Sequence, residues 1–408
     1  MSAPAPTIDL TDVDRFVRGE HHHMFDWLRV NDPVHWHELA DGRGFWALTR
    51  YRDLVTAYRE HTVFSSAGGA MLGGSFRSDL DTAAGLMLVA ADPPRHRLLR
   101  QVIHRAFAPH VVDRITAEVT ALVDAALRRA LADGGCDFAT DLATALPAGA
   151  LIGVLGIGAG DAHHLIGLTR KMIGFRDPAL VDTTEDADER LRLAGIQADI
   201  FEFFADLVRL RRRHPGDGLV DLLLSADLNG HPLTEEEILY NCMNVAVGGN
   251  ETSSYSACAG ILALAEYPAQ YRQLLDGADL DPALNEILRW SSTNAYVQRI
   301  AKRDTTLAGR PIRAGDSVTL WNVSANRDPD QFPHPHRFDI TRTPNRHLTY
   351  GSGVHRCIGA PVAHVELSIL FRRLTKQRIT FELAGPPTRL RSNFILGITH
   401  LPLHLRPG

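Results

Sequence analysis

The stretch Tyr350-Gly-Ser-Gly-Val-His-Arg-Cys-Ile-Gly-Ala360 carries one of only four cysteines in a chain of 408 residues. Its three glycines let the backbone fold tightly around the Cys357 sulfur and direct amide N–H groups toward it. A helical pattern begins at Ala360, so a helix N-terminus adds positive potential, and His355 and Arg356 lie close by. These features favour a thiolate. Such a thiolate suits either axial binding of a soft metal or nucleophilic catalysis, which also needs a base and an oxyanion hole.

The other three cysteines are expected to be unreactive. Cys136 lies in a predicted turn, and Cys242 and Cys258 lie in a helical pattern, where a small buried thiol is the usual interpretation. Four cysteines without a CxxC pair exclude a disulfide scaffold, a zinc ribbon and a CxxCH heme attachment. A reducing cytoplasm is therefore predicted.

Charge and hydropathy exclude further classes of protein. With 43 basic and 48 acidic residues, the net charge of −5 leaves no footprint for nucleic acid. The N-terminus lacks the basic and apolar blocks of a signal peptide. The apolar stretch 143–160 is interrupted by Thr144 and Pro147, so it predicts a buried helix and no membrane span.

The chain reads as mainly α with small β-sheets, in a single domain over 1–408. Helical periodicity dominates from 95 to 290, and a last helix is predicted over 360–374. A hairpin is predicted over 34–48, and a strand-like tail over 401–405. The sequence contains neither an internal repeat nor a Ser/Gly-rich linker.

One predicted helix is unusually long and has polar residues at its centre. It begins at the capping box Thr234-Glu-Glu-Glu237 and runs for about 32 residues, or roughly 48 Å. Its centre is Val247-Gly-Gly-Asn-Glu-Thr-Ser253. Two adjacent glycines cost roughly 1 kcal/mol each relative to alanine, but they leave the backbone open to close approach. The residues alone are compatible with a tolerated kink in a core helix or with a functional groove.

The cysteine loop resembles the heme-binding loop of the cytochromes P450, aromatic-Gly-x-Gly-x-His-x-Cys-x-Gly, with Tyr350 in place of the usual Phe. The resemblance implies the P450 fold, in which heme lies between a long central helix and the cysteine loop. It implies that Cys357 is the axial ligand of heme iron, a thiolate that favours O–O cleavage. The other cofactor-binding residues implied in this loop are Tyr350, Gly351, Gly353, His355 and Gly359.

Further segments match that family in the expected order along the chain. Asp92-Pro-Pro-Arg-His96 begins a helix in which His96 and Arg100 are one turn apart, a suitable clamp for a carboxylate. By resemblance these two residues, with Arg299 and His355, bind the heme propionates. The resemblance also implies that Gly248 lies against the heme.

The same resemblance assigns the catalytic and structural residues. It implies that Thr252 hydrogen-bonds to dioxygen and that Glu251, with ordered water, relays protons. Glu286 and Arg289 match E-x-x-R and share a helix face, with Arg337 as the third partner of a structural network.

The chain also departs from the family pattern at four positions. These are Gly248 for Ala, Ser253 for Thr, Arg95 for Glu and His364 for Arg. The last two lie where contact with an electron donor is expected, and they put that contact in doubt.

The function implied is a soluble bacterial heme-thiolate monooxygenase with heme b, O2 as co-substrate and NAD(P)H electrons. Because the heme domain uses the whole chain, a separate ferredoxin or flavodoxin and its reductase are expected. The substrate is expected to be a small-molecule partner of the bulky, natural-product-like kind. Two alternatives are a peroxide-driven peroxygenase, which the Glu251–Thr252 pair disfavours, and a non-catalytic gas-binding heme protein.

The substrate pocket is expected to draw on segments 71–89, 172–185, 245–248, 293–297 and 394–397, with a glycine-rich access loop. The access-loop glycines are Gly68, Gly69, Gly73 and Gly74. The pocket residues are Met87, Val245, Val247, Asn294, Val297 and Ile395.

Overall fold

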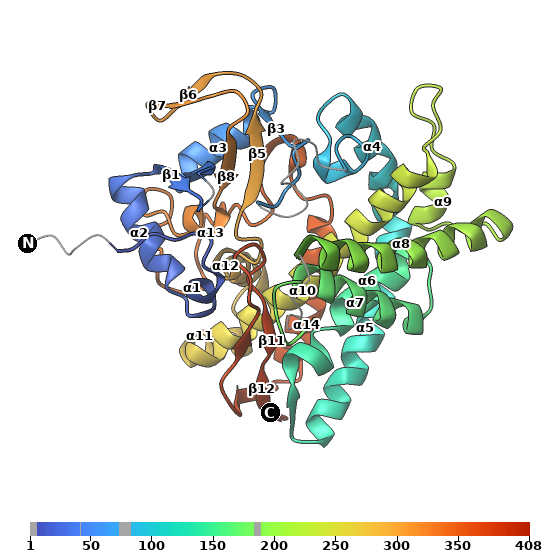
Figure 1. Ribbon diagram of the computed structural model, residues 1–408. Helices are drawn as coiled ribbons and strands as arrows, with labels where there is room; N and C mark the ends of the chain where they lie inside the picture. Colours follow the sequence, from blue (N-terminus) through green and yellow to red (C-terminus); the bar gives the residue numbers. More distant parts are fainter. Residues whose placement is uncertain (1–5, 41, 73–82, 183–188) are drawn as a thin grey trace, which may run out of the picture.

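A computed structural model describes residues 6–40, 42–72, 83–182 and 189–408. In Figure 1 the N-terminal helices and the largest sheet lie to the left and top, and helices α4 to α9 lie to the right. The α-helices are α1 (Val13–Val17), α2 (His21–Asn31), α3 (Tyr51–Arg59), α4 (Arg95–His104), α5 (Pro109–Ala132), α6 (Ala145–Leu155), α7 (Ala159–Ile173), α8 (Glu189–Arg213), α9 (Leu219–Leu224), α10 (Glu235–Glu266), α11 (Pro268–Leu275), α12 (Leu280–Ser291), α13 (Asn322–Ala325) and α14 (Ala360–Lys376). Short 3₁₀ or π turns are η1 (Leu88–Ala90), η2 (Arg105–Phe107), η3 (Phe138–Leu142) and η4 (Gly353–His355).

The strands form small sheets, as predicted. The largest has the order β1-β2-β8-β5-β3; only β2 and β8 pair in parallel. Its first two strands are the expected hairpin, with Val34 opposite Leu48. The other sheets have the orders β4-β12-β9, β10-β11 and β6-β7. The strands are β1 (Val34–Glu38), β2 (Gly44–Leu48), β3 (Phe64–Ser65), β4 (Gly135–Asp137), β5 (Val297–Ala301), β6 (Thr305–Leu307), β7 (Arg310–Ile312), β8 (Ser317–Leu320), β9 (Thr380–Leu383), β10 (Thr388–Arg389), β11 (Ile398–His400) and β12 (Pro402–Arg406).

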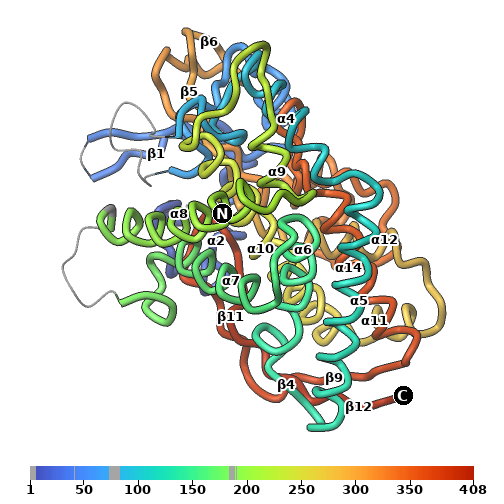
Figure 2. Tube along the Cα trace, turned by 90° about the vertical axis from the view of Figure 1, so that its right-hand side faces the viewer, coloured from blue at the N-terminus to red at the C-terminus, as the bar shows by residue number. Residues whose placement is uncertain are grey.

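Helix α10 is the predicted long helix, 32 residues from Glu235 to Glu266. Its capping box is present, because the Glu237 backbone N–H donates to Thr234 Oγ1 at 3.2 Å and the Thr234 N–H donates to Glu237 Oε2 at 2.8 Å. Figures 1 and 2 show it running through the middle of the molecule beside α6, α7 and α14. This position makes it the scaffold of the interior.

Helices α5 and α6 pack against each other at very short range. A Cβ added to Gly149 would lie 2.6 Å from the Val119 backbone nitrogen, and one at Gly153 would lie 2.4 Å from the Ile115 side chain. The apolar stretch Phe138–Leu155, which includes α6, is long enough to cross a membrane but is 78% buried inside the protein. It is a core element, as the sequence predicted. The one correction here concerns Cys136, which lies in strand β4 and not in a turn, because β4 pairs with β12.

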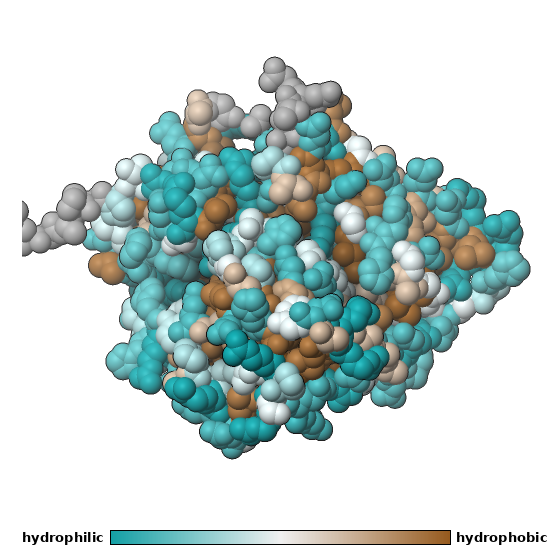
Figure 3. All heavy atoms as spheres, turned by 90° about the horizontal axis from the view of Figure 1, so that it is seen from below, coloured by the Kyte–Doolittle hydropathy of each residue, from teal (hydrophilic) through white to brown (hydrophobic). Residues whose placement is uncertain are grey.

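The outer surface is predominantly polar where Figure 3 displays it. Viewed from below, hydrophilic side chains predominate and apolar ones form small groups between them. Buried hydrophobic residues instead gather inside, in one large cluster shared by α4 to α12, α14 and the C-terminal strands. The burial of this cluster is the main driving force for folding.

Candidate functional site

The cysteine loop is held against helix α3. Gly353 has a φ of +70°, and a Cβ there would lie 2.4 Å from the Tyr58 carbonyl oxygen. The Cys357 backbone N–H donates to the Tyr350 carbonyl at 2.9 Å, which closes the loop on itself. Only glycine combines this conformation with this close contact. Gly353 therefore fixes the position of Cys357 relative to helix α3.

The electrostatics of Cys357 combine opposing effects. Burial among the loop atoms raises the pKa of its thiol, whereas the N–H groups of Gly359 and Ala360 and the Arg100 guanidinium lower it. The features named from the sequence all favour the thiolate, but burial, the largest effect on this pKa, acts in the opposite direction. Cys357 is nevertheless exposed on one side. Its sulfur is accessible to an incoming metal, and a cation there would favour the thiolate.

Four basic residues gather beside this loop, as predicted. The His96 and His355 rings lie 4.1 Å apart between centroids, and Arg100 Nη2 donates to the Arg356 carbonyl at 2.8 Å. Arg299, on β5, is 5% exposed and stacks 5.8 Å from the Tyr58 ring. Burial is the main cause that lowers the pKa of His96, to about 4, with nearby Arg100 contributing. Burial and Arg299 lower the pKa of His355 as well.

These basic groups lack anionic partners within the described ranges. Both His96 ring nitrogens and His355 Nε2 are buried without a hydrogen bond. The carboxylate that acts electrostatically on His96 is Asp92, which already accepts from Ser65 Oγ at 2.6 Å and the Ser66 N–H at 2.9 Å. Buried donors and cations require compensation by acceptors or negative charge. A dicarboxylate such as heme, with its iron near Cys357, fits this set of residues.

The centre of α10 presents an open face of backbone. Gly248 and Gly249 are exposed, and a Cβ at either would meet nothing within 4 Å. The Thr252 hydroxyl donates to the Gly248 carbonyl at 2.9 Å, one turn back along the helix. With its hydrogen occupied, this oxygen offers its lone pairs to a donor. The structure therefore favours the groove over an internal kink packed in the core.

The Glu251 side chain binds residues outside the groove that holds Thr252. Its carboxylate is 1% exposed and pairs with Arg170 of α7, with Nε at 3.2 and 3.3 Å from its two oxygens. Burial raises the pKa of Glu251, whereas Arg170 and the Tyr255 hydroxyl lower it. A relay role therefore requires the carboxylate to leave Arg170.

Sequence reasoning missed the partly buried Arg170 and the buried residues Tyr255 and Glu366. Glu366 on α14 is 1% exposed, and burial raises its pKa to about 8. Its Oε1 has no hydrogen-bond partner in the part of the chain described, and Ser253 lies beside it. This contact brings the helix that follows Cys357 alongside the residue that follows Thr252. The only signal in the sequence was the polar Glu366 within the apolar pattern of the last helix.

The structure brings two residues of the predicted network together and places another arginine at the third position. Glu286 and Arg289 are both fully buried and form a bidentate pair at 2.7 Å. The predicted third residue, Arg337, is exposed and contributes only its carbonyl, which accepts from Arg289 Nη2 at 3.3 Å. Arg342 takes its place, with Nε 3.1 Å from Glu286 Oε2. Because the Arg337 carbonyl faces inward, its side chain points to solvent.

Asn345 and Asp339 complete this network. The Asn345 side-chain amide donates to Glu286 Oε2 at 3.0 Å, and the Asp339 backbone N–H donates to Oε1 at 2.9 Å. The Glu286 charge is thus compensated by donors from two segments, helix α12 and residues 339–345.

The predicted pocket residues lie on several elements around α10. Val245, Val247, Met87 and Val297 are partly buried, whereas Ile395 is 3% exposed. Asn294 and Ile395 are paired as an isolated β-bridge, which joins two of the predicted segments. Gly73 and Gly74 of the predicted access loop, and 183–185, lie outside the described residues. The position of the pocket therefore stays a prediction.

Comparisons with known proteins show the family to which the chain belongs. The family model described as Cytochrome P450 matches residues 175–276 and 280–398. Linalool 8-monooxygenase of Pseudomonas putida is 32% identical over 407 residues, covering 98% of this chain and 99% of that protein. The methyl-branched lipid omega-hydroxylase of Mycobacterium tuberculosis is 36% identical over 368 residues, covering 89% and 84%.

A solved structure is equally similar. A Mycobacterium marinum cytochrome P450 in complex with pseudoionone superposes with a TM-score of 0.86 at 31% identity, covering 98% of this chain and 99% of that one. With the cysteine loop, the basic cluster and the long grooved helix in place, the chain belongs to the cytochrome P450 family of enzymes.

Proposed function

We propose that this enzyme is a heme-thiolate monooxygenase that inserts one oxygen atom of O2 into an apolar, natural-product-like organic substrate. The observation that carries the proposal is the combination of an exposed Cys357 with a neighbouring cluster of buried, uncompensated basic groups. Thr252 lies on an open helix face in the same fold.

The residues present fit heme b. Cys357 would bind the iron, and His96, Arg100, Arg299 and His355 would neutralise the two propionates. Gly351 and Gly353 hold the loop that begins at Tyr350 against Tyr58 of α3, whereas Gly359 beside the sulfur and Gly248 on α10 would leave room for the cofactor. When bound, heme supplies the iron at which O2 is activated.

Proton delivery belongs to the protein. Because its hydrogen is donated to the Gly248 carbonyl, the Thr252 oxygen can accept a hydrogen bond from a group bound in the groove. Glu251 holds or releases a proton at its carboxylate, since burial and Arg170 act on its pKa in opposite directions. Exchange of the carboxylate between Arg170 and groove water would move protons inward.

The substrate side of the proposal rests on an apolar lining with one polar group. Met87, Val245, Val247, Val297 and Ile395 would contact hydrocarbon, and Asn294 would hydrogen-bond to an oxygen of the substrate. One similar protein is named for linalool, and one similar structure contains pseudoionone. These two molecules are therefore suitable first probes.

Electrons would come from NAD(P)H through a separate ferredoxin or flavodoxin and its reductase in the cytoplasm. The proposed single heme domain over 1–408 includes no flavin-binding or iron–sulfur segment that we identify in the sequence.

The deciding experiment combines binding with isotope incorporation. Linalool or pseudoionone should displace axial water and shift the heme absorbance, and turnover with ferredoxin, reductase and ¹⁸O2 should place one ¹⁸O in product. Label from H2¹⁸O2 alone, with none from O2, would establish the peroxygenase alternative. Reversible O2 binding without turnover with any donor would establish a gas-binding protein.

The cysteine assignment has its own test, made on the reduced protein with carbon monoxide. Cys357→Ala should abolish the red-shifted absorbance band that a thiolate ligand gives. Cys136→Ala is the matched control and should retain the band, because this cysteine lies in strand β4, away from the loop. A Cys357→Ala protein with an unchanged band would refute the ligand assignment.

A further inference from the structure

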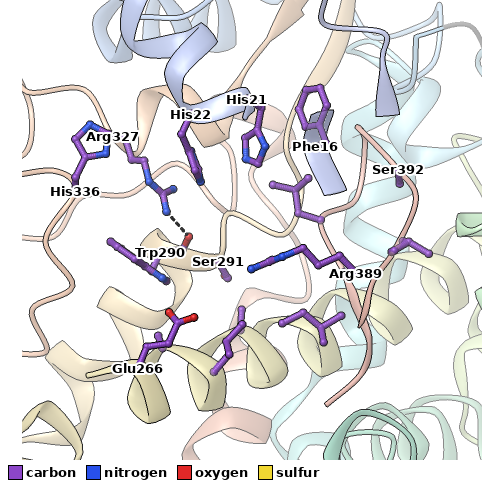
Figure 4. A pocket seen from close by; sticks show the side chains of 17 residues that line it. Phe16, His21, His22, Glu266, Trp290, Ser291, Arg327, His336, Arg389 and Ser392 are labelled. Atoms are coloured by element: carbon purple, nitrogen blue, oxygen red, sulfur yellow. Dashed lines mark hydrogen bonds between the residues drawn. The ribbon is translucent and has the colours of Figure 1, made fainter. Parts of the chain in front are cut away.

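A second cavity, of about 230 Å³, lies beneath helix α2 and beside the C-terminal half of α10. Figure 4 shows residues around it from the N-terminal helices, α10, α12, the segment after α13 and the C-terminal segment. Its nearest residue on α10 is Ala259, seven residues beyond Thr252 and so roughly 10 Å along the helix. The cavity includes no residue of the cysteine loop or of the Gly248–Thr252 groove. It is therefore distinct from the site already described.

The polar side of the cavity carries an excess of positive charge. Arg327 is 5% exposed, and its Nη1 has no hydrogen-bond partner in the portion of the chain described. Its Nη2 donates to the Trp290 carbonyl at 3.2 Å, and the guanidinium lies 4.7 Å from the centre of the Trp290 ring. Figure 4 shows this guanidinium directed into the cavity, with Arg389 reaching in from the opposite side.

Other polar groups do not compensate Arg327. His21 is 5% exposed, and both of its ring nitrogens are unpartnered among the described residues. His22 and Ser291 are further neutral groups, and His336 is paired with Asp26 at 3.2 Å. Glu266 is the acidic residue of the lining, and its electrostatic partner is Arg389. One buried guanidinium and the donors around it therefore remain free for an anion.

The faces of the cavity formed by α10 and the C-terminal segment are mainly apolar. Ala259, Leu262 and Ala263 form the face on α10, and Leu390, Leu396 and Ile398 close the wall from the C-terminal segment. An inorganic anion would leave this surface without contacts, whereas a hydrocarbon group would cover it. The volume is below the ~300–1,000 Å³ of pockets for drug-sized ligands, so the occupant is small.

We propose that this cavity is a second ligand site, which binds a small organic monocarboxylate with its carboxylate on Arg327, attracted also by the Arg389 charge at the mouth, and its hydrocarbon on α10. The carboxylate oxygens accept from Arg327 Nη1 and from the histidine ring N–H groups. The unpartnered, buried guanidinium and the apolar face opposite it specify both halves of such a ligand. The site stands independently of the oxygenase reaction proposed above.

Calorimetry on the heme-loaded protein tests the proposal, with the heme pocket blocked by saturating 4-phenylimidazole. Benzoate should bind with a stoichiometry near one, whereas benzamide and inorganic phosphate should each bind at least about 10-fold more weakly. Equal binding of benzamide would overturn the role of charge, and equal binding of phosphate the role of the apolar face. Absence of benzoate binding would mean that the cavity holds only water.

Variants locate the binding. Arg389→Gln, at the exposed mouth, should weaken benzoate binding about 3-fold or more, and Arg327→Met about 10-fold or more. Ala259→Leu leaves both arginines in place but fills the cavity, so it should abolish binding. Arg391→Gln is the matched control, because Arg391 pairs with Asp14 and does not line the cavity. Should Arg327→Met fail to fold, Arg389→Gln and Ala259→Leu decide alone, and unchanged affinity in both would overturn the site.

Discussion

At the scale of the residue, the Thr252 hydroxyl links the helix backbone to the groove. Its hydrogen goes to the Gly248 carbonyl, which fixes the direction of its lone pairs. Thr252→Ala removes the acceptor and leaves the groove wider. We expect heme content to be unchanged while reducing equivalents are diverted to hydrogen peroxide. The ratio of product formed to NAD(P)H consumed measures this directly.

Thr252→Ser is the matched control for that experiment. It retains a hydroxyl one turn from the same carbonyl, so the coupling of electrons to product should stay close to that of the parent enzyme. If Thr252→Ala is as well coupled as Thr252→Ser, the hydroxyl has no part in proton delivery.

Glu366 makes stability depend on pH at the same scale. Burial raises its pKa from 4.5 to about 8. Between these values the folded protein keeps a proton that the unfolded chain releases, so the free energy of unfolding falls as pH rises from about 5 to 8. Glu366→Gln removes this titration. Over that pH range the free energy of unfolding of the variant should therefore rise relative to that of the parent protein, by up to roughly 3–5 kcal/mol. Urea unfolding at several pH values measures the difference.

Glu236→Gln serves as the comparison, because Glu236 is exposed in the first turn of α10. Its pH profile should follow that of the parent protein. A Glu366→Gln profile that also runs parallel to the parent would show that this carboxyl titrates normally.

At the scale of the element, the crossing of α5 and α6 depends on glycine. A Cβ at Gly149 would lie 2.6 Å from the Val119 backbone nitrogen and 2.7 Å from its Cα, and backbone cannot rotate away. Gly149→Ala should therefore destabilise the protein by about 1–3 kcal/mol through overpacking. Thermal unfolding followed by circular dichroism checks the loss.

Gly167→Ala is the same substitution in the middle of α7. A Cβ at Gly167 would meet nothing within 4 Å, so the change should be neutral or should stabilise the helix by up to about 1 kcal/mol. Equal destabilisation at both positions would mean that local backbone preference, and not helix packing, determines the effect.

At the scale of the whole molecule, the Glu286 network joins two segments that are far apart in sequence. Helix α12 provides Glu286 and Arg289, and the segment before the cysteine loop provides Arg342 and Asn345. Arg342→Met leaves a fully buried carboxylate short of one cation, which costs about 3–5 kcal/mol. We expect a lower free energy of unfolding and loss of heme at elevated temperature.

Arg337→Met provides the control for the network. Since this side chain is exposed and its carbonyl is retained, the free energy of unfolding should change by no more than about 0.5 kcal/mol. The reverse order of the two variants would restore Arg337 as the third partner.

The sequence by itself determined the features encoded by local spacing. Three such features are the glycines around Cys357, the i, i+4 pair of His96 and Arg100, and the capping box of α10. Within each feature, the residues are at most a few positions apart in the sequence. Their geometry therefore follows from backbone periodicity. Membership of the cytochrome P450 family, and with it the fold, followed from these short patterns.

Only the tertiary structure decided which distant side chains meet. Arg170 is 81 residues from Glu251, and Arg342 is 56 residues from Glu286. The choice of Arg342 over Arg337 depended on which way one carbonyl faces, and the cavity at Arg327 exists only because α2, α10 and β10 converge there. Such contacts depend on how the elements pack in three dimensions. Hydropathy and secondary-structure propensity along the chain do not predict that packing.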